Sequence, residues 1–183
     1  MRRKLKVLFI STIIIISIIG IIVAAEKILE KNNTGIKEII DNIAQKEETT
    51  TEDPFLLSDE VIKNYLTPNE YSRPGKELKE VNAIVVHYVG NPGTTAAQNR
   101  SYFENLKDTH ATSASSHYII GMEGEIIQCV PLNEISYASN NRNKDTIAIE
   151  CCHPDETGQF TTATYKSLVK LVAALCRTYD LDP

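Results

Sequence analysis

An uncharged apolar run, Val7 to Ala25, sets the first limit on how this chain can be arranged. As a helix its nineteen residues would be about 28 Å long, close to the roughly 30 Å hydrocarbon core of a bilayer. Arg2, Arg3, Lys4 and Lys6 precede the run. The positive-inside rule therefore predicts a single-pass helix over 7–25 in the cell membrane, with 1–6 as a cytoplasmic tail and everything after the helix extracytoplasmic.

A cleaved signal peptide is the alternative interpretation of this run. Residues 23–25 (VAA) would suit a cleavage site, but the run is longer than the 7–15 apolar residues usual in a signal peptide. An uncleaved anchor is therefore favoured. In both cases the remainder of the chain is exported.

The rest of the chain divides into a polar stalk and one domain. Residues 26–54 end in a charged, Thr-rich stretch closed by a proline, which is typical of a linker. The expected domain covers 55–183. From residue 26 onward, 15 basic residues face 24 acidic ones. This acidic excess argues against nucleic acid as a partner, because nucleic-acid binding needs a basic face.

Alternating strand and helix patterns predict an α/β domain with a mixed β-sheet flanked by helices. The fragment Glu123-Gly124 lies between two apolar runs and indicates a hairpin. Thr95 and Gln98 fit a capping box at the start of a helix. The expected strands are 83–86, 118–122, 125–130 and 146–152, and the expected helices are 56–66, one after residue 95, and 162–179.

The last of these helices has an apolar stripe at helical spacing, which predicts its buried face. The stripe consists of Tyr165, Leu168, Val169, Leu171, Val172 and Leu175.

The chain contains four cysteines, Cys129, Cys151, Cys152 and Cys176. They include no C-x-x-C pair, so neither a zinc-finger nor a thioredoxin-type site is supported. Small buried apolar residues are the favoured interpretation over disulfides.

The polar residues that end two of the predicted strands are the first candidates for chemistry. His87 follows four apolar residues, and Glu150 follows Ile-Ala-Ile. In α/β sheets the carboxyl ends of strands present ligands and catalytic groups. An imidazole and a carboxylate there suit zinc hydrolysis. The alternative is an ordinary strand-end histidine with a solvated glutamate, and spacing alone favours that alternative.

Five stretches, in this order along the chain, give a more specific indication. They resemble the zinc-dependent N-acetylmuramoyl-L-alanine amidase family, whose fold is also that of phage amidase endolysins and peptidoglycan recognition proteins. The resemblance covers about Glu70 to Pro183. The stretches are YSRPG at 71–75, IVVHYVGNPG at 84–93, SSHYIIG at 115–121, EGEIIQCVP at 123–131 and TIAIECCHPD at 146–155.

The resemblance implies an enzyme that hydrolyses the amide bond between N-acetylmuramic acid and L-alanine of peptidoglycan, with Zn²⁺ as cofactor. His87 matches the family's first zinc ligand. Glu150 matches the glutamate that orients and deprotonates the zinc-bound water. His117, Tyr118 and Asn141 are the expected substrate-binding residues, although a hydrogen-bonded structural histidine is an equal alternative for His117.

The chain departs from the family pattern at its end. The family's other two zinc ligands and a catalytic lysine follow the last helix, and this sequence stops at Pro183, where that segment should begin. We therefore expect a domain that lacks its C-terminal end, or a degenerate one. The rival functions are a catalytically inactive, membrane-anchored peptidoglycan-binding module and a non-functional fragment. His153 matches no family ligand and is interpreted as a structural loop residue.

One imidazole cannot hold Zn²⁺ tightly, because catalytic zinc sites use three protein ligands. We therefore predict that the 183-residue chain contains no stoichiometric zinc. Metal analysis of the purified protein checks this. One tightly bound zinc per chain would instead make His117, His153 or Cys152 a ligand.

Overall fold

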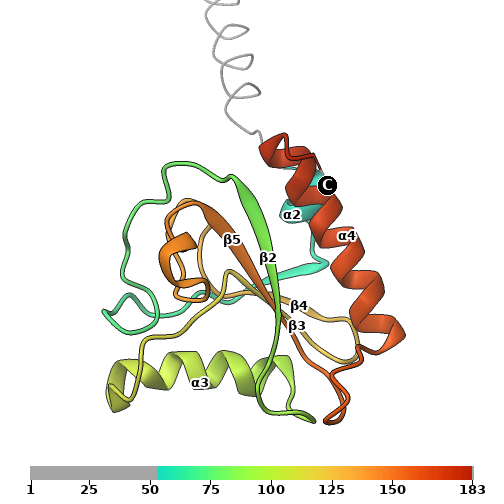
Figure 1. The fold of residues 1–183 in the computed structure, drawn as a ribbon, viewed down its shortest axis with the longest axis horizontal. Helices are drawn as coiled ribbons and strands as arrows, with labels where there is room; N and C mark the ends of the chain where they lie inside the picture. The colour runs from blue at the N-terminus through green and yellow to red at the C-terminus, as the bar shows by residue number, and fades with distance from the viewer. Residues whose placement is uncertain (1–52, 183) are drawn as a thin grey trace, which may run out of the picture. The chain divides into compact units, whose positions relative to one another are not determined.

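Five strands form one sheet in the order β1-β4-β3-β5-β2 (Figure 1). The hairpin strands β3 and β4 are antiparallel, and the other neighbouring pairs are parallel. The predicted mixed sheet and the predicted hairpin are confirmed. The strands are β1 (Val61–Lys63), β2 (Ala83–Tyr88), β3 (Tyr118–Ile120), β4 (Ile126–Gln128) and β5 (Thr146–Cys151).

The structure, a computed structural model, describes residues 53–182. The predicted cytoplasmic tail, the membrane helix and nearly all of the stalk lie outside the described residues. Within 53–182, no helix is long and apolar enough to cross a membrane. The helices are α2 (Pro54–Leu57), α3 (Ala96–Thr109), the 3-10 helix η1 (Asn140–Arg142) and α4 (Thr162–Tyr179).

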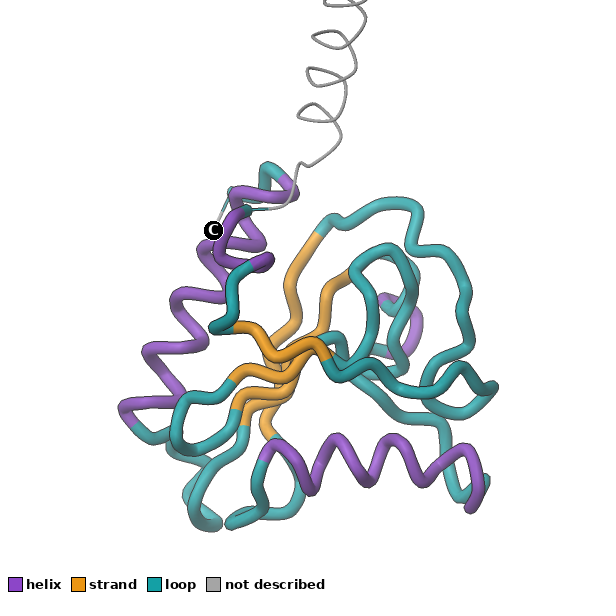
Figure 2. The backbone as a smooth tube through the Cα atoms, turned by 180° about the vertical axis from the view of Figure 1, so that it is seen from behind, coloured by secondary structure: helices purple, strands orange, loops and turns teal. Residues whose placement is uncertain are grey.

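The helices α3 and α4 lie on opposite sides of the sheet (Figures 1 and 2). Side chains along β5 point alternately to the two sides of the sheet, because a strand has a period of two residues. Ile147, Ile149 and Cys151 join the apolar cluster that includes α4, and Cys152 joins the cluster that includes α3. All four cysteines are free; Cys129, Cys151 and Cys152 are buried, as predicted, whereas Cys176 is half-buried.

Helix α3 begins as the sequence predicts. The Thr95 side chain accepts a hydrogen bond from the Gln98 backbone N–H, and the Gln98 side chain accepts one from the Thr95 backbone N–H. Two donors at the helix start are thereby satisfied. The helix ends at Thr109 and is capped by His110, whose φ of 54° lies in the left-handed region.

Helix α4 has the predicted bounds, but its buried face is narrower than predicted. Tyr165 and Val169 are 60% and 51% exposed. Leu168, Leu171 and Leu175 of the predicted stripe are buried, and Thr164 and Ala174, which the stripe did not include, are buried with them. The spacing of apolar residues in the sequence identifies which residues could be buried. Packing against the rest of the domain decides which of them are.

Hydroxyl groups join the start of α4 to the turn of the β3–β4 hairpin. Thr161 donates to the carbonyl of Met122 and Thr164 to that of Gly121, at 2.6 and 2.9 Å. Ser167 donates to the carbonyl of Gly124 at 2.6 Å. These bonds fix the helix over the hairpin.

The predicted helix over 56–66 is wrong for most of its length. The helix ends at Leu57, and Val61–Lys63 forms β1, which pairs in parallel with β4. A short isolated helix is only marginally stable, whereas the open edge of β4 binds the backbone of this segment in a parallel ladder. This pairing joins residues more than sixty positions apart.

A half-buried ion pair fixes two long loops beside the sheet. The Arg73 guanidinium donates two hydrogen bonds to the Glu134 carboxylate, at 2.7 and 2.8 Å. It donates a third to the carbonyl of Leu66 at 2.8 Å. Both charged side chains are less than a fifth exposed.

We predict that Arg73→Lys lowers the free energy of unfolding by about 1–3 kcal/mol, because an ammonium cannot reproduce the paired donors of a guanidinium. Urea unfolding at pH 7 measures the change. Arg142→Lys is the matched control: Arg142 also pairs with a carboxylate, that of Asp145, but its side chain is 52% exposed. Equal losses in both variants would contradict a special role for Arg73.

Candidate functional site

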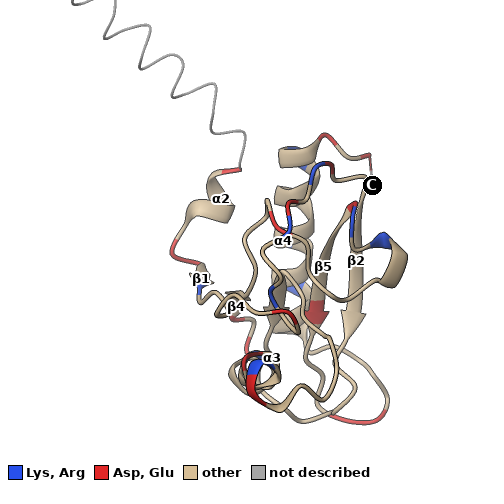
Figure 3. Cartoon of the chain, turned by 90° about the vertical axis from the view of Figure 1, so that its left-hand side faces the viewer, with Lys and Arg blue, Asp and Glu red and all other residues tan. Residues whose placement is uncertain are grey.

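His87 and Glu150 are direct neighbours across two parallel strands. The register of β2 and β5 pairs His87 with Glu150, and residues in register point to the same face of a sheet. Glu150 is the one acidic residue of β5 and appears as the red band on that strand beside β2 (Figure 3). The two residues predicted to carry the chemistry are therefore brought together.

The His87 ring is half-buried and lies next to the loop that leads into η1. Its Nε2 is 3.3 Å from the hydroxyl oxygen of Ser139. Sequence reasoning did not find Ser139. The only local signal was its position directly before the asparagine pair at 140–141.

The Glu150 carboxylate is mostly enclosed. Its Oε2 atom is buried and has no hydrogen-bond partner. Burial disfavours the charged form and raises the pKa of Glu150 to about 7. At neutral pH this carboxyl group is therefore divided between its acid and base forms, which suits a group that transfers protons.

The side chains of residues 53–182 do not by themselves complete a zinc site. No group of three or more His, Cys, Asp or Glu side chains in this range is arranged to hold a metal ion. The pair at the strand ends provides one imidazole and one carboxylate. A catalytic zinc site uses three protein ligands and an open position.

His117 lies directly before β3 and is fully buried. Its Nε2 is 2.9 Å from the carbonyl oxygen of Glu134, to which it must donate. Its Nδ1 accepts from the backbone N–H of Ala148 at 3.0 Å and faces the Ser136 hydroxyl at the same distance. This pattern fixes the neutral tautomer, and burial lowers the pKa of His117 to about 4.

The placement of His117 favours the hydrogen-bonded structural alternative over a groove residue. Tyr118 is also fully buried, within the apolar cluster that includes α4. Asn141, by contrast, lies in η1 and is exposed. Contact of these three residues with substrate stays a prediction, and Asn141 has the accessibility that such contact requires.

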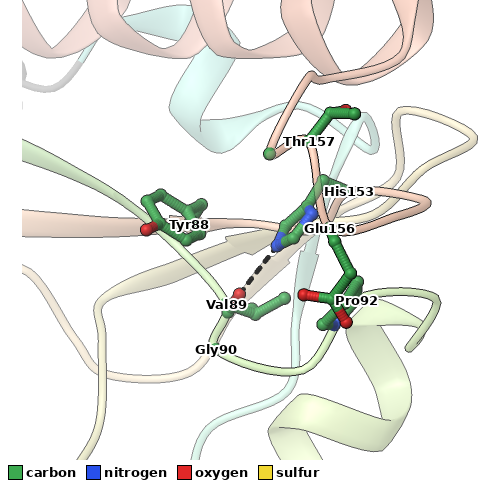
Figure 4. Close-up of a pocket in the computed structure, with 8 residues that line it drawn as sticks. Tyr88, Val89, Gly90, Pro92, His153, Glu156 and Thr157 are labelled. Atoms are coloured by element: carbon green, nitrogen blue, oxygen red, sulfur yellow. Dashed lines mark hydrogen bonds between the residues drawn. The ribbon is translucent and has the colours of Figure 1, made fainter.

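A cavity of about 430 Å³ lies at the carboxyl ends of β2 and β5 (Figure 4). His153, predicted as a structural loop residue, belongs to its wall and is 2% exposed. The carboxyl ends of parallel strands are where such sheets offer binding space. The other lining residues are Tyr88, Val89, Gly90, Pro92, Glu156, Thr157 and Gly158.

Comparison with known sequences agrees with the motifs. The profile of the family described as N-acetylmuramoyl-L-alanine amidase matches residues 77–183. The N-acetylmuramoyl-L-alanine amidase CwlL of Bacillus licheniformis is 32% identical over 135 residues, which cover 67% of this chain and 37% of that protein. The chain thus spans little more than a third of the length of the curated relatives that it matches.

Solved structures share the fold. The amidase LysC from Clostridium intestinale URNW superposes with a TM-score of 0.54 at 17% identity, covering 68% of this chain and 79% of that one. A mutant endolysin from Bacillus subtilis gives 0.53 at 26% identity, covering 67% and 78%. The sequence profile extends over more than half of the chain and includes both His87 and Glu150, and this chain belongs to the N-acetylmuramoyl-L-alanine amidase family.

Proposed function

We propose that this chain acts in peptidoglycan hydrolysis, by cleaving the amide bond between the lactyl group of N-acetylmuramic acid and L-alanine. The observation that carries the proposal is the pairing of His87 with Glu150 at one end of two parallel strands. The buried, unpartnered oxygen of Glu150 gives this pair a proton-transfer group. Family membership supplies the reaction class.

Glu150 has the properties of the base in this reaction. As a carboxylate it accepts a proton from the water that attacks the amide carbonyl. As the C–N bond breaks, it returns this proton to the departing nitrogen. The new lactyl carboxylic acid loses its remaining proton to the amino group of L-alanine, so the products are a carboxylate and an ammonium group. A pKa of about 7 allows both steps at neutral pH.

Zn²⁺ is the proposed cofactor, as is typical of the family, and His87 is its proposed ligand. When bound, such a metal polarises a carbonyl and acidifies water. The described residues supply only part of its ligand set. Asn141 is the proposed substrate contact. It lies on the exposed helix η1, two residues after Ser139, whose hydroxyl oxygen is close to the His87 ring.

A peptidoglycan-binding module without catalysis is the second candidate. The incomplete ligand set among residues 53–182 is the observation that favours it. The two functions leave different products: hydrolysis creates new N-terminal alanine, whereas binding alone retains the protein on sedimented wall and creates none.

We also propose that residues 7–25 anchor the protein in the cell membrane and that 26–54 act as an extracytoplasmic stalk for the domain at 55–183. The uncharged run and the basic residues before it support this orientation. A stalk of this length would let the domain reach the wall polymer just outside the membrane, since a flexible chain spans about 5–6 Å times the square root of its residue number.

We predict that Glu150→Gln lowers the rate at which new N-terminal alanine appears in purified peptidoglycan by about 10²–10⁴-fold, because it removes the proton acceptor. In the unsubstituted protein, the rate should rise as pH increases through about 7, since Glu150 acts as a base only when deprotonated. Measuring new amino groups in the presence of added zinc tests both effects.

Glu80→Gln is the matched control, because Glu80 is exposed in the loop before β2. It should hydrolyse the wall at the unsubstituted rate. If the unsubstituted protein bound the wall without exposing new N-terminal alanine, the enzymatic proposal would be overturned in favour of the binding module.

The anchor predicts that the protein, produced in a bacterium, sediments with the membrane fraction and is digested by protease added outside spheroplasts. Removing residues 1–25 while supplying a cleavable signal peptide should release the domain into the medium. A full-length protein found free in the cytosol would contradict the anchor.

A further inference from the structure

The His153 side chain connects two loops that follow the carboxyl ends of β2 and β5. Its Nε2 is 2.8 Å from the carbonyl oxygen of Val89, in the loop after β2 (Figure 4). Its Nδ1 is 2.7 Å from the carbonyl oxygen of Asp155, in the loop after β5. The two ring nitrogens therefore face two backbone carbonyls across the end of the sheet.

The chemistry of these partners fixes the charge of the ring. A carbonyl oxygen only accepts hydrogen bonds, so each nitrogen of His153 must donate. A neutral imidazole has a single N–H, and only the imidazolium has two. A neutral His153 would point a lone pair at a carbonyl lone pair at less than 3 Å. His117 differs because one of its nitrogens accepts from a backbone N–H.

The groups around the ring agree with a cation. The Tyr88 ring of β2 lies 5.3 Å away at an interplanar angle of 82°, an edge-to-face contact. Asp155 and Glu156, from the loop after β5, are the acidic groups that face His153. The hydrogen bond to the Val89 carbonyl, with smaller contributions from Asp155 and Glu156, raises the pKa of His153.

We propose that protonated His153 is a positioning residue: a pH-dependent clasp that holds the end of β2 against the end of β5. Val89 lies two residues after His87, and His153 lies three residues after Glu150. Two backbone bonds also join these segments, from Val89 N–H to the Cys151 carbonyl and from Gly93 N–H to the His153 carbonyl. Among these three links, only the side-chain bond changes with a proton.

By holding the two strand ends together, the clasp would also keep the spacing between His87 and Glu150 fixed. The importance of that spacing for amide hydrolysis rests on the proposed function. The clasp itself does not.

The sign of the pH effect follows from linkage. Because the pKa of His153 is higher in the folded chain than in the unfolded chain, the clasp stabilises fully below the unfolded pKa of about 6.5. Above that value the unfolded chain loses its proton first, and the unfolding equilibrium constant increases by up to about tenfold per pH unit. The contribution is lost once the pH passes the pKa of the folded state.

The test combines nitrogen NMR of the histidine rings in the full chain with unfolding equilibria from pH 5.5 to 8.5. At pH 6 the unsubstituted protein should show two protonated ring nitrogens for His153. The backbone amide signals of Val89 and Gly90 should follow the same titration. Two variants separate the two hydrogen bonds of His153. His153→Gln keeps a donor near the Nε2 position, and His153→Asn keeps one near the Nδ1 position.

Each variant holds one carbonyl at most, so both should lose the His153 part of the pH dependence, and the Val89 and Gly90 signals should no longer titrate. His110→Asn is the matched control, because His110 is exposed at the left-handed end of α3, a conformation that asparagine tolerates. This variant should keep the unsubstituted pH profile.

A single protonated nitrogen on His153 at pH 6 would overturn the proposal, and so would parallel pH profiles of the unsubstituted protein and His153→Gln. If the variants do not fold, the spectrum of the unsubstituted protein decides the charge and the titration of Val89 and Gly90 decides the clasp. Failure of the proposed function is a separate result: a protein that binds the wall without hydrolysing it would contradict that function but would give the same NMR spectra.

Discussion

The parallel pairing of β2 with β5 is the interaction on which the other features of this domain depend. Six consecutive residue pairs are in register, from Ala83 with Thr146 to Tyr88 with Cys151. Because the strands run in the same direction, their carboxyl ends meet at one edge of the sheet. His87 and Glu150 are neighbours for this reason, and the loops that carry Val89 and His153 leave the sheet side by side. β5 also pairs with β3 on its other side, so the site stands on a strand held from both edges.

Three histidines near this sheet show how hydrogen-bond partners, rather than residue type, set chemical character. His117 has one acceptor and one donor as partners, is fully buried, and is held neutral. His153 has two carbonyl acceptors and is held as a cation. His87 lies within reach of a serine hydroxyl only at 3.3 Å and keeps partial access to solvent, which leaves its ring available to a ligand.

Glu150 shows the same effect for a carboxylate. Its unpartnered buried oxygen is costly to ionise, and the cost appears as a pKa near 7. The Glu134 carboxylate, by contrast, is paired with Arg73, and that pair fixes the loop whose backbone carbonyl orients His117. Glu134 is thus satisfied where it supports the structure, whereas Glu150 at the candidate site keeps an unsatisfied oxygen.

The sequence alone determined the α/β class, the hairpin, the capping box at Thr95 and the strand-end positions of His87 and Glu150, because each depends on residues close together in the chain. The tertiary structure decided what depends on distant partners. β1 exists because β4 offers it an edge, and Tyr165 is exposed although it belongs to the apolar stripe of α4. The burial of His117 and Tyr118 and the charge of His153 were equally beyond local patterns, since the Val89 carbonyl that His153 contacts lies 64 positions away.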